Sequence, residues 1–199
     1  MKIGVRAHDY GKHSIEGLAS LLREEGYDGA QLALPKVFEE IDSYEDIRLS
    51  HIERIRRAFE KNRVEIPVMG CYMDLGNPDR SVREYAVETL KNCLLYAKEM
   101  GAGVVGTETA YPRLSREERA AWCPYMMDSL MRVMEEAQRI DMKLAIEPVY
   151  WHPLADLETT LKTIRMVGDP DHLRLIFDAS NLLEFPETTD QDAYWNQWL

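Results

Sequence analysis

The chain has 199 residues, of which 45% are hydrophobic, and its formal net charge at pH 7 is -11. This length allows one domain with a substantial core, and we treat residues 1–199 as that single domain. The negative charge repels nucleic-acid phosphates and anionic membrane surfaces, so it argues against both as partners. No apolar run approaches the roughly 18 residues of a membrane span. Met1 leads straight into a strand-like run without a signal-peptide pattern, so we expect a cytoplasmic protein.

Six short runs that are apolar through their middles predict the strands of a sheet covered on both faces. They are Lys2–Ala7, Gly29–Leu34, Glu65–Tyr72, Gly103–Thr107, Lys143–Pro148 and Leu173–Asp178. Three cysteines, Cys71, Cys93 and Cys123, are widely spaced and set among apolar neighbours. That pattern is typical of reduced thiols rather than a disulfide framework.

Helical segments lie between the predicted strands. They are Ser14–Glu25, Ser50–Asn62, Ser81–Met100, a segment from Ser115 to about Ile140, and one from Asp156 to about Val167. Ser81 with Glu84, and Ser115 with Glu118, match the capping-box pattern at a helix start. Gly101 is a helix stop signal. After Asn181 we expect a loop and the beginning of a further helix.

The alternation of strand and helix predicts right-handed βαβ units and a parallel α/β fold of the TIM-barrel type. An eight-unit barrel typically needs about 250 residues. We therefore expect an incomplete barrel with about six of eight units, truncated before strands 7 and 8. A doubly wound open sheet is the alternative, but the segment HDYGKHSIEG after the first strand lacks the GxGxxG turn. Open sheet edges need cover, from a second copy in a homo-oligomer or from further residues of the gene product.

Polar side chains follow several predicted strands, where parallel α/β folds place their working residues. Glu147 and Asp178 each close an apolar run on neighbouring strands, so their buried charges would repel each other without a cation or proton between them. A divalent metal resolves that conflict. The alternative is that one or both carboxylates cap the following loop or pair with Arg or Lys.

Four further residues are candidates for contact with a substrate: His8, Glu108, His152 and Asn181. For each of them an ordinary structural role stays open: a satisfied histidine for His8, an ion pair for Glu108, a solvated loop position for His152 and a turn cap for Asn181. Tyr72 and Trp151 are candidates for an apolar wall against a sugar ring, with ordinary packing as the alternative.

Several segments carry a family resemblance. GVVGTET, AIEPVYWHP and IFDASNLL, together with the long segment GCYMDLGNPDRSVREYAVETLKNCLLYAKEMGAGVV, resemble the sugar phosphate isomerase/epimerase family. This group belongs to the xylose isomerase-like TIM barrels of the AP endonuclease family 2 superfamily. The resemblance is collinear and covers nearly the whole chain. The group spans ketose 3-epimerases, inosose dehydratases, hydroxypyruvate isomerases and dehydroshikimate dehydratases, so the resemblance does not name the substrate.

The resemblance implies a divalent metal (Mn, Mg, Co or Zn) held by Glu of strand 5, Asp of strand 6, His of strand 7 and Glu of strand 8. The first two correspond to Glu147 and Asp178, and no residue of this chain corresponds to the others. The strand 5 and strand 8 glutamates are also the acid/base pair of the epimerases, so Glu147 is the candidate catalytic residue. A site with two carboxylates should bind metal weakly. Whether this chain is itself an enzyme stays open.

Three functions follow from these observations. The leading one is a metal-dependent isomerase or epimerase that acts on a sugar or sugar phosphate by proton transfer next to a carbonyl. A second is a non-catalytic truncated barrel that forms an oligomer. A third is an endonuclease IV-like nuclease, which requires a histidine-rich metal cluster and a basic rim; five histidines and a charge of -11 argue against it.

Overall fold

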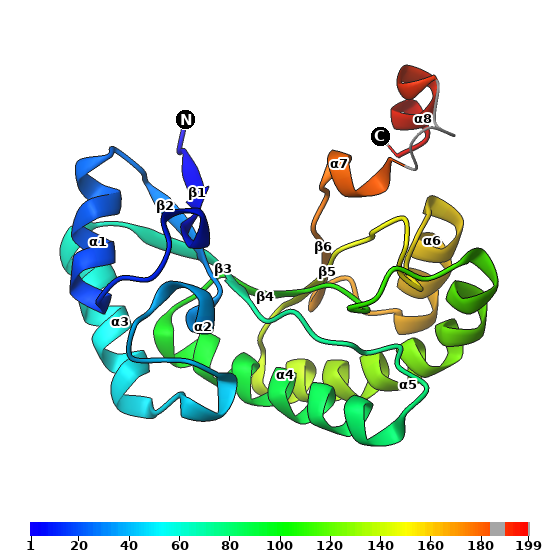
Figure 1. Cartoon of the computed structure of the whole chain (residues 1–199), viewed down its shortest axis with the longest axis horizontal. Coiled ribbons are helices and arrows are strands. Elements are labelled where there is room, and N and C mark those ends of the chain that lie inside the picture. Colours follow the sequence, from blue (N-terminus) through cyan, green and yellow to red (C-terminus); the bar gives the residue numbers. More distant parts are fainter. Residues whose placement is uncertain (184–189, 199) are drawn as a thin grey trace.

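The computed structural model describes residues 1–183 and 190–198 and contains a six-stranded parallel sheet (Figure 1). The strands are β1 (Gly4–Arg6), β2 (Gly29–Leu32), β3 (Glu65–Gly70), β4 (Val104–Thr107), β5 (Leu144–Ile146) and β6 (Leu173–Leu175). They follow one another in the sheet in chain order, from β1 to β6. The sequence predicted all six, although each observed strand is shorter than its predicted run.

The helices lie along the outside of the curved sheet (Figure 1). They are α1 (Ile15–Glu24), α2 (Leu34–Val37), α3 (Leu49–Asn62), α4 (Arg80–Met100), α5 (Arg116–Ile140), α6 (Leu157–Val167), α7 (Ala179–Leu182) and α8 (Gln191–Trp198). Two 3-10 turns, Ala7–Tyr10 and Tyr44–Asp46, complete the elements. The five long helices match the predicted segments, while α2, α7 and the 3-10 turns carry too short a pattern to be predicted. The expected helix after Asn181 corresponds to α8, and most of the expected loop before it lies outside the described residues.

The strand order decides between the two parallel folds considered from the sequence. A doubly wound sheet reverses its strand order at a switch point. Here every strand pairs with its successor in the chain, which confirms the barrel-type α/β fold. Among the described residues β1 and β6 each have one strand neighbour, so the sheet is open between them and the barrel is incomplete.

The core lies between the sheet and the outer helices, which bury one apolar face each. Fully buried side chains there include Leu18, Leu22, Ile55, Phe59, Leu90, Leu94, Leu130 and Val133. On the concave side of the sheet, Gly106 provides room that a side chain would fill. A Cβ at this position would lie 2.7 Å from Ile176 Cδ1 and 3.0 Å from Val68 Cγ1. In the described part of the chain no helix is both long and apolar enough to cross a membrane.

The helix starts confirm one predicted capping box and correct the other. Ser115 caps α5 by accepting from Glu118 N at 3.2 Å, and the Glu118 carboxylate returns a bond to Ser115 N. The predicted box of Ser81 with Glu84 is wrong, because Asp79 caps α4 and Ser81 N is a donor to it at 2.8 Å. Asp79 lies two residues before Ser81, and its carboxylate already accepts from a free N–H group of the first helical turn.

Glu84 has a different role from the predicted one. It accepts hydrogen bonds from Arg132 of α5, one of them 3.0 Å long, and so links the two longest helices. The three cysteines are free thiols, as expected from their spacing.

These caps generate a stability test. The Ser115→Ala variant should lose about 1 kcal/mol of unfolding free energy, because it leaves helix N–H groups without an acceptor. Ser81→Ala should lose less than about half of that, since Asp79 remains as the cap. Urea unfolding followed by circular dichroism measures both. A Ser81→Ala loss as large as that of Ser115→Ala would contradict the assignment of Asp79.

Candidate functional site

Three carboxylates lie at the carboxyl ends of neighbouring strands, and we call Glu108, Glu147 and Asp178 the acidic rim. Glu108 directly follows β4, Glu147 directly follows β5, and Asp178 lies just beyond β6. Backbone pairing fixes these positions: Glu147 N donates to Thr107 O at 2.9 Å. The sequence prediction that these strand ends bring acidic groups to one edge is confirmed by the sheet order.

Glu147 is the most buried member of the acidic rim, with 6% of its surface exposed. Its Oε1 accepts a hydrogen bond from Asn181 Nδ2 at 2.7 Å. Burial raises the pKa of Glu147, the Asn181 hydrogen bond opposes that shift, and the charge of Asp178 adds to it. Asn181, which the sequence left between a substrate contact and a turn cap, therefore holds this carboxylate in place.

Asp178 caps a helix and also adds a negative charge to the acidic rim. It is the N-cap residue of α7, and its Oδ1 accepts from Ser180 N at 2.9 Å and from Asn181 N at 3.4 Å. The capping alternative is thus what the structure shows for this oxygen. Its charge nonetheless acts on the rim, since it raises the pKa values of both Glu147 and Glu108 beyond the effect of their burial.

Glu108 faces a buried histidine from the next loop. Glu108 Oε2 lies 3.8 Å from His152 Nδ1, and the His152 side chain is 1% exposed. The solvated position considered for His152 is therefore wrong. Burial raises the pKa of Glu108 to about 7, with the charges of Glu147 and Asp178 adding to the shift and that of Lys36 opposing it. Burial lowers the pKa of His152 to about 4, so this histidine is neutral at pH 7 and the pair is no salt bridge.

Basic and aromatic residues face the acidic rim from β1, β2 and β3. Gln31 of β2 donates a hydrogen bond to Tyr72 Oη, and Lys36 Nζ lies 4.8 Å from the centre of the Tyr72 ring. His8 follows β1, and its buried Nδ1 has no hydrogen-bond partner among residues 1–183 and 190–198. Burial lowers the pKa of His8, and the charges of Arg6 and Lys36 lower it further.

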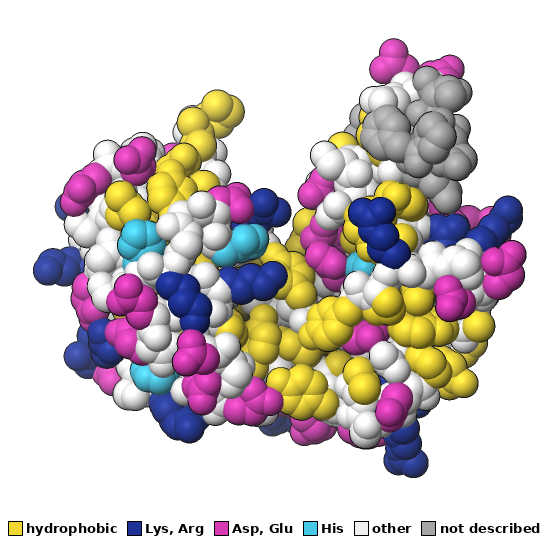
Figure 2. Space-filling model, viewed as in Figure 1, with side chains coloured by type: hydrophobic (Ala, Val, Ile, Leu, Met, Phe, Trp, Pro, Cys, Tyr) yellow, Lys and Arg dark blue, Asp and Glu magenta, His cyan; other side chains and the backbone are white. Residues whose placement is uncertain are grey.

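Figure 2 shows a hollow between the half of the molecule that carries β1 and the half that carries β6. Histidine, basic and acidic side chains are visible on both sides of this hollow (Figure 2). The residues that directly follow strands, His8 among them, could be predicted from the sequence. Gln31, which lies inside a strand, and Lys36, which lies a helical turn beyond one, could not. The position of Lys36 four residues after the end of β2 was the one available signal.

The acidic rim offers oxygen ligands of the kind that hard divalent cations prefer. Glu147 and Asp178 fit such an ion in donor type and in their mutual repulsion. They are two ligands, and among the described residues no group of three or more His, Cys, Asp or Glu side chains is arranged to hold a metal. The described part of the chain therefore offers two carboxylates as candidate ligands and no complete metal shell.

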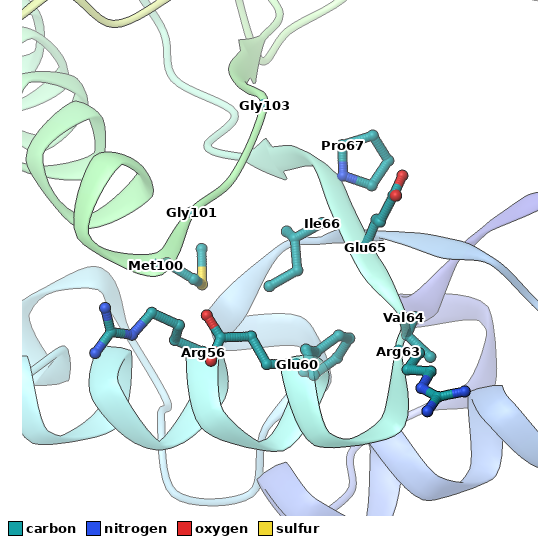
Figure 3. Close-up of a pocket in the computed structure, with 11 residues that line it drawn as sticks. Arg56, Glu60, Arg63, Val64, Glu65, Ile66, Pro67, Met100, Gly101 and Gly103 are labelled. Atoms are coloured by element: carbon teal, nitrogen blue, oxygen red, sulfur yellow. The ribbon is translucent and has the colours of Figure 1, made fainter.

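Three larger cavities are lined by residues outside the acidic rim, and one of them, of about 480 Å³, lies between α5 and α6. One of about 430 Å³ lies between the ends of α3 and α4, where Arg56, Glu60, Met100 and Gly103 surround it (Figure 3). It is at the amino ends of the strands, the side of a barrel that serves stability rather than chemistry. Another, of about 520 Å³, lies beside Trp151 and the first turn of α5. The carboxyl-end rim is accordingly the candidate site.

The raised pKa of Glu108 makes stability depend on pH. The pKa of Glu108 is about 7 in the folded chain and has an ordinary value of 4.5. The contribution of Glu108 to the unfolding free energy is therefore fully present below pH 4.5 and is lost as the pH rises through 7. In a chelator, Glu108→Gln should gain stability over the parent, and the gain should grow by about 2 kcal/mol from pH 5 to pH 8.5, discounted for partial exposure. Thermal unfolding measures it.

The matched control is Glu99→Gln, which removes a carboxylate from an exposed position of α4. Its effect on stability should be the same at both pH values. A gain for Glu108→Gln that does not change with pH would contradict the electrostatic description of the rim.

The fold and the rim can be compared with known proteins. A model of the xylose isomerase-like TIM barrel family matches residues 19–197. No curated protein matches the sequence. D-psicose 3-epimerase from Clostridium cellulolyticum H10, solved with D-tagatose, has a TM-score of 0.75 at 13% identity and aligns with 94% of this chain and 67% of its own. 3-Keto-D-glucoside 4-epimerase from E. coli has a TM-score of 0.75 at 16% identity, over 100% of this chain and 76% of its own.

A third solved structure adds a metal. A xylose isomerase-like TIM barrel protein from Mycobacterium smegmatis, in complex with magnesium, has a TM-score of 0.71 at 15% identity and aligns with 97% of this chain and 71% of its own. At such identities these structures show the shared fold. The family match covers most of the sequence and agrees with the observed strand order. The chain belongs to the xylose isomerase-like TIM barrel family.

Proposed function

We propose that this chain is a divalent-metal-dependent isomerase or epimerase that moves a proton next to the carbonyl of a sugar or sugar phosphate. The observation that carries the proposal is the buried Glu147 carboxylate, held by Asn181 beside the charge of Asp178 at the carboxyl end of the sheet. The sugar epimerases among the structural neighbours support the reaction class.

Glu147 is the proposed catalytic residue. A base that removes a proton next to a carbonyl works best when its pKa is close to the working pH, and burial moves the pKa of Glu147 upward in that direction. Asn181 donates a hydrogen bond to Oε1 and so restrains the carboxylate, while Oε2 takes no part in that bond. Proton return by Glu147 to the same face would regenerate the substrate or move the carbonyl along the chain, whereas epimerisation needs an acid on the opposite face, the role that the resemblance gives to the strand 8 glutamate.

Glu147 and Asp178 are the proposed metal ligands. A divalent cation bound there would polarise the substrate carbonyl and lower the barrier to proton removal. Magnesium in a family neighbour supports this assignment. Since the chain offers two carboxylates, weak binding is expected unless substrate oxygens or another copy complete the shell.

The other candidate residues are proposed to bind the sugar. The neutral His152 and the protonated fraction of Glu108 can donate hydrogen bonds to hydroxyl groups at pH 7. His8 Nδ1 has no hydrogen-bond partner in the described part of the chain, and a side-chain rotation that exposes it would let it bond a sugar hydroxyl. Tyr72 and Trp151 supply apolar surface near these groups, and Trp151 already stacks edge-on against His152 with ring centres 5.8 Å apart.

We also propose that two copies cover each other's sheet edges in the cytoplasm. Leu175, Phe177 and Ile3, at or beside the edge strands, are 41%, 50% and 53% exposed. Apolar side chains beside unpaired strand edges favour association. A non-catalytic oligomer remains the alternative function, and it differs from the proposed enzyme in metal binding and proton exchange.

Calorimetric titration of Mn²⁺ tests the metal site. The parent chain should bind Mn²⁺ weakly, or with micromolar affinity where another copy completes the shell, and the Glu147→Gln/Asp178→Asn variant should not bind. The control variant Glu99→Gln/Asp171→Asn removes two exposed carboxylates elsewhere and should keep the parent affinity. Unchanged affinity in the rim variant would place the metal elsewhere.

Deuterium exchange tests the chemistry. With Mn²⁺ in D₂O, the parent chain should exchange the hydrogen next to the carbonyl of D-tagatose or D-fructose for deuterium. Proton NMR of the sugar, after the metal has been chelated, measures the loss of that hydrogen signal. Glu147→Gln should lose at least about 100-fold in rate, the usual contribution of a general base. A folded parent chain that binds neither metal nor sugar would instead favour the non-catalytic oligomer.

A further inference from the structure

Lys36 places a positive charge near the rim without forming an ion pair to any carboxylate of the described chain. It lies in α2, four residues beyond the end of β2, and its side chain is exposed. Its Nζ lies 4.8 Å from the centre of the Tyr72 ring, and among the described residues it has neither an ion pair nor a hydrogen bond. A cation with this contact alone keeps its donors available for a ligand.

The Tyr72 ring keeps the exposed side chain of Lys36 close to the rim. Tyr72 is itself fixed by the hydrogen bond from Gln31, so the ring is a rigid platform for the ammonium group. The helix α2, which carries Lys36, packs against the 3-10 turn Ala7–Tyr10, which carries His8, so both residues belong to the same wall of the site. His8 Nδ1 has no hydrogen-bond partner among the described residues.

The two sides of the site therefore carry different sets of charges. Its β4–β6 side carries the three carboxylates of the acidic rim, which repel an anion, and Arg113, which lies 4.4 Å from the centre of the Trp151 ring. Its β1–β2 side carries Lys36 and Arg6, and Arg6 is already paired with Asp9 at 3.0 Å. A ligand with a neutral polyol at one end and an anion at the other has one favourable orientation across this field.

We infer that the rim site takes an anionic sugar, with its phosphate or carboxylate group bound by Lys36 and His8 and its carbonyl end at Glu147. This inference deepens the proposed function and rests on it. The net charge of -11 does not oppose it, because charges farther than about 8 Å are largely screened at physiological salt and the nearest charge decides. Lys36 presents a charge that the fold does not use for an ion pair, and the anion would supply its partner.

Binding affinities measured by calorimetry test the inference, with and without Mn²⁺ so that metal-bound phosphate is not mistaken for the Lys36 contact. The ligands are D-fructose 6-phosphate, D-glucuronate, D-fructose and inorganic phosphate. The parent chain should bind an anionic sugar at least tenfold more tightly than D-fructose, a difference of about 1.4 kcal/mol. Lys36→Gln should remove that preference and leave the affinity for D-fructose unchanged. Lys61→Gln, an equal charge change at the exposed end of α3, should keep the preference.

Each outcome has one meaning. A preference for the phosphate or for the carboxylate identifies the source of the anion. Equal binding of D-fructose and both anionic sugars, or a preference that survives Lys36→Gln, overturns the inference and leaves the proposed function standing. Inorganic phosphate binding as tightly as the sugar phosphate would overturn it as well. A chain that binds no sugar at all overturns the proposed function and this inference together.

Discussion

The site depends on one electrostatic constraint, the burial of Glu147 beside the charges of Asp178 and Glu108. A buried carboxylate is unfavourable unless hydrogen bonds, a proton or a cation compensate it. Asn181 supplies one hydrogen bond at 2.7 Å, and the pKa values of Glu147 and Glu108 remain raised in spite of it. The rim is therefore arranged to hold a proton or a cation, and both are what chemistry next to a carbonyl requires.

The parallel sheet imposes that constraint. Strands β4, β5 and β6 are neighbours in parallel register, so whatever follows them emerges at the same edge. Apolar strand interiors and buried helix faces stabilise this arrangement, and the rim residues contribute little to it. The burial of apolar side chains thus offsets the repulsion between the like charges of the acidic rim. Active sites commonly lower the stability of a protein in this way.

Much of the fold followed from periodicity and punctuation, since long alternating segments leave little choice of architecture. Glu147 and Asp178 were found because each ends an apolar run. What the sequence left open depended on contacts between distant residues: whether His152 is buried, that Asn181 bonds to Glu147, and that Lys36 lies over Tyr72. The capping error at Ser81 is of another kind. Two good caps, Asp79 and Ser81, lie two residues apart, and the local pattern does not rank them.

Carbon-13 NMR titration of the glutamate side-chain carboxyls is the most direct measurement of the central claim. The pKa of Glu147 should lie above the ordinary glutamate value of 4.5, fall in the Asp178→Asn variant, and fall in the parent chain when diamagnetic Mg²⁺ is added. A Glu147 carboxyl that titrates at the ordinary value and responds to neither change would contradict the account, because the rim would then hold no electrostatic strain for a cation or a proton to relieve.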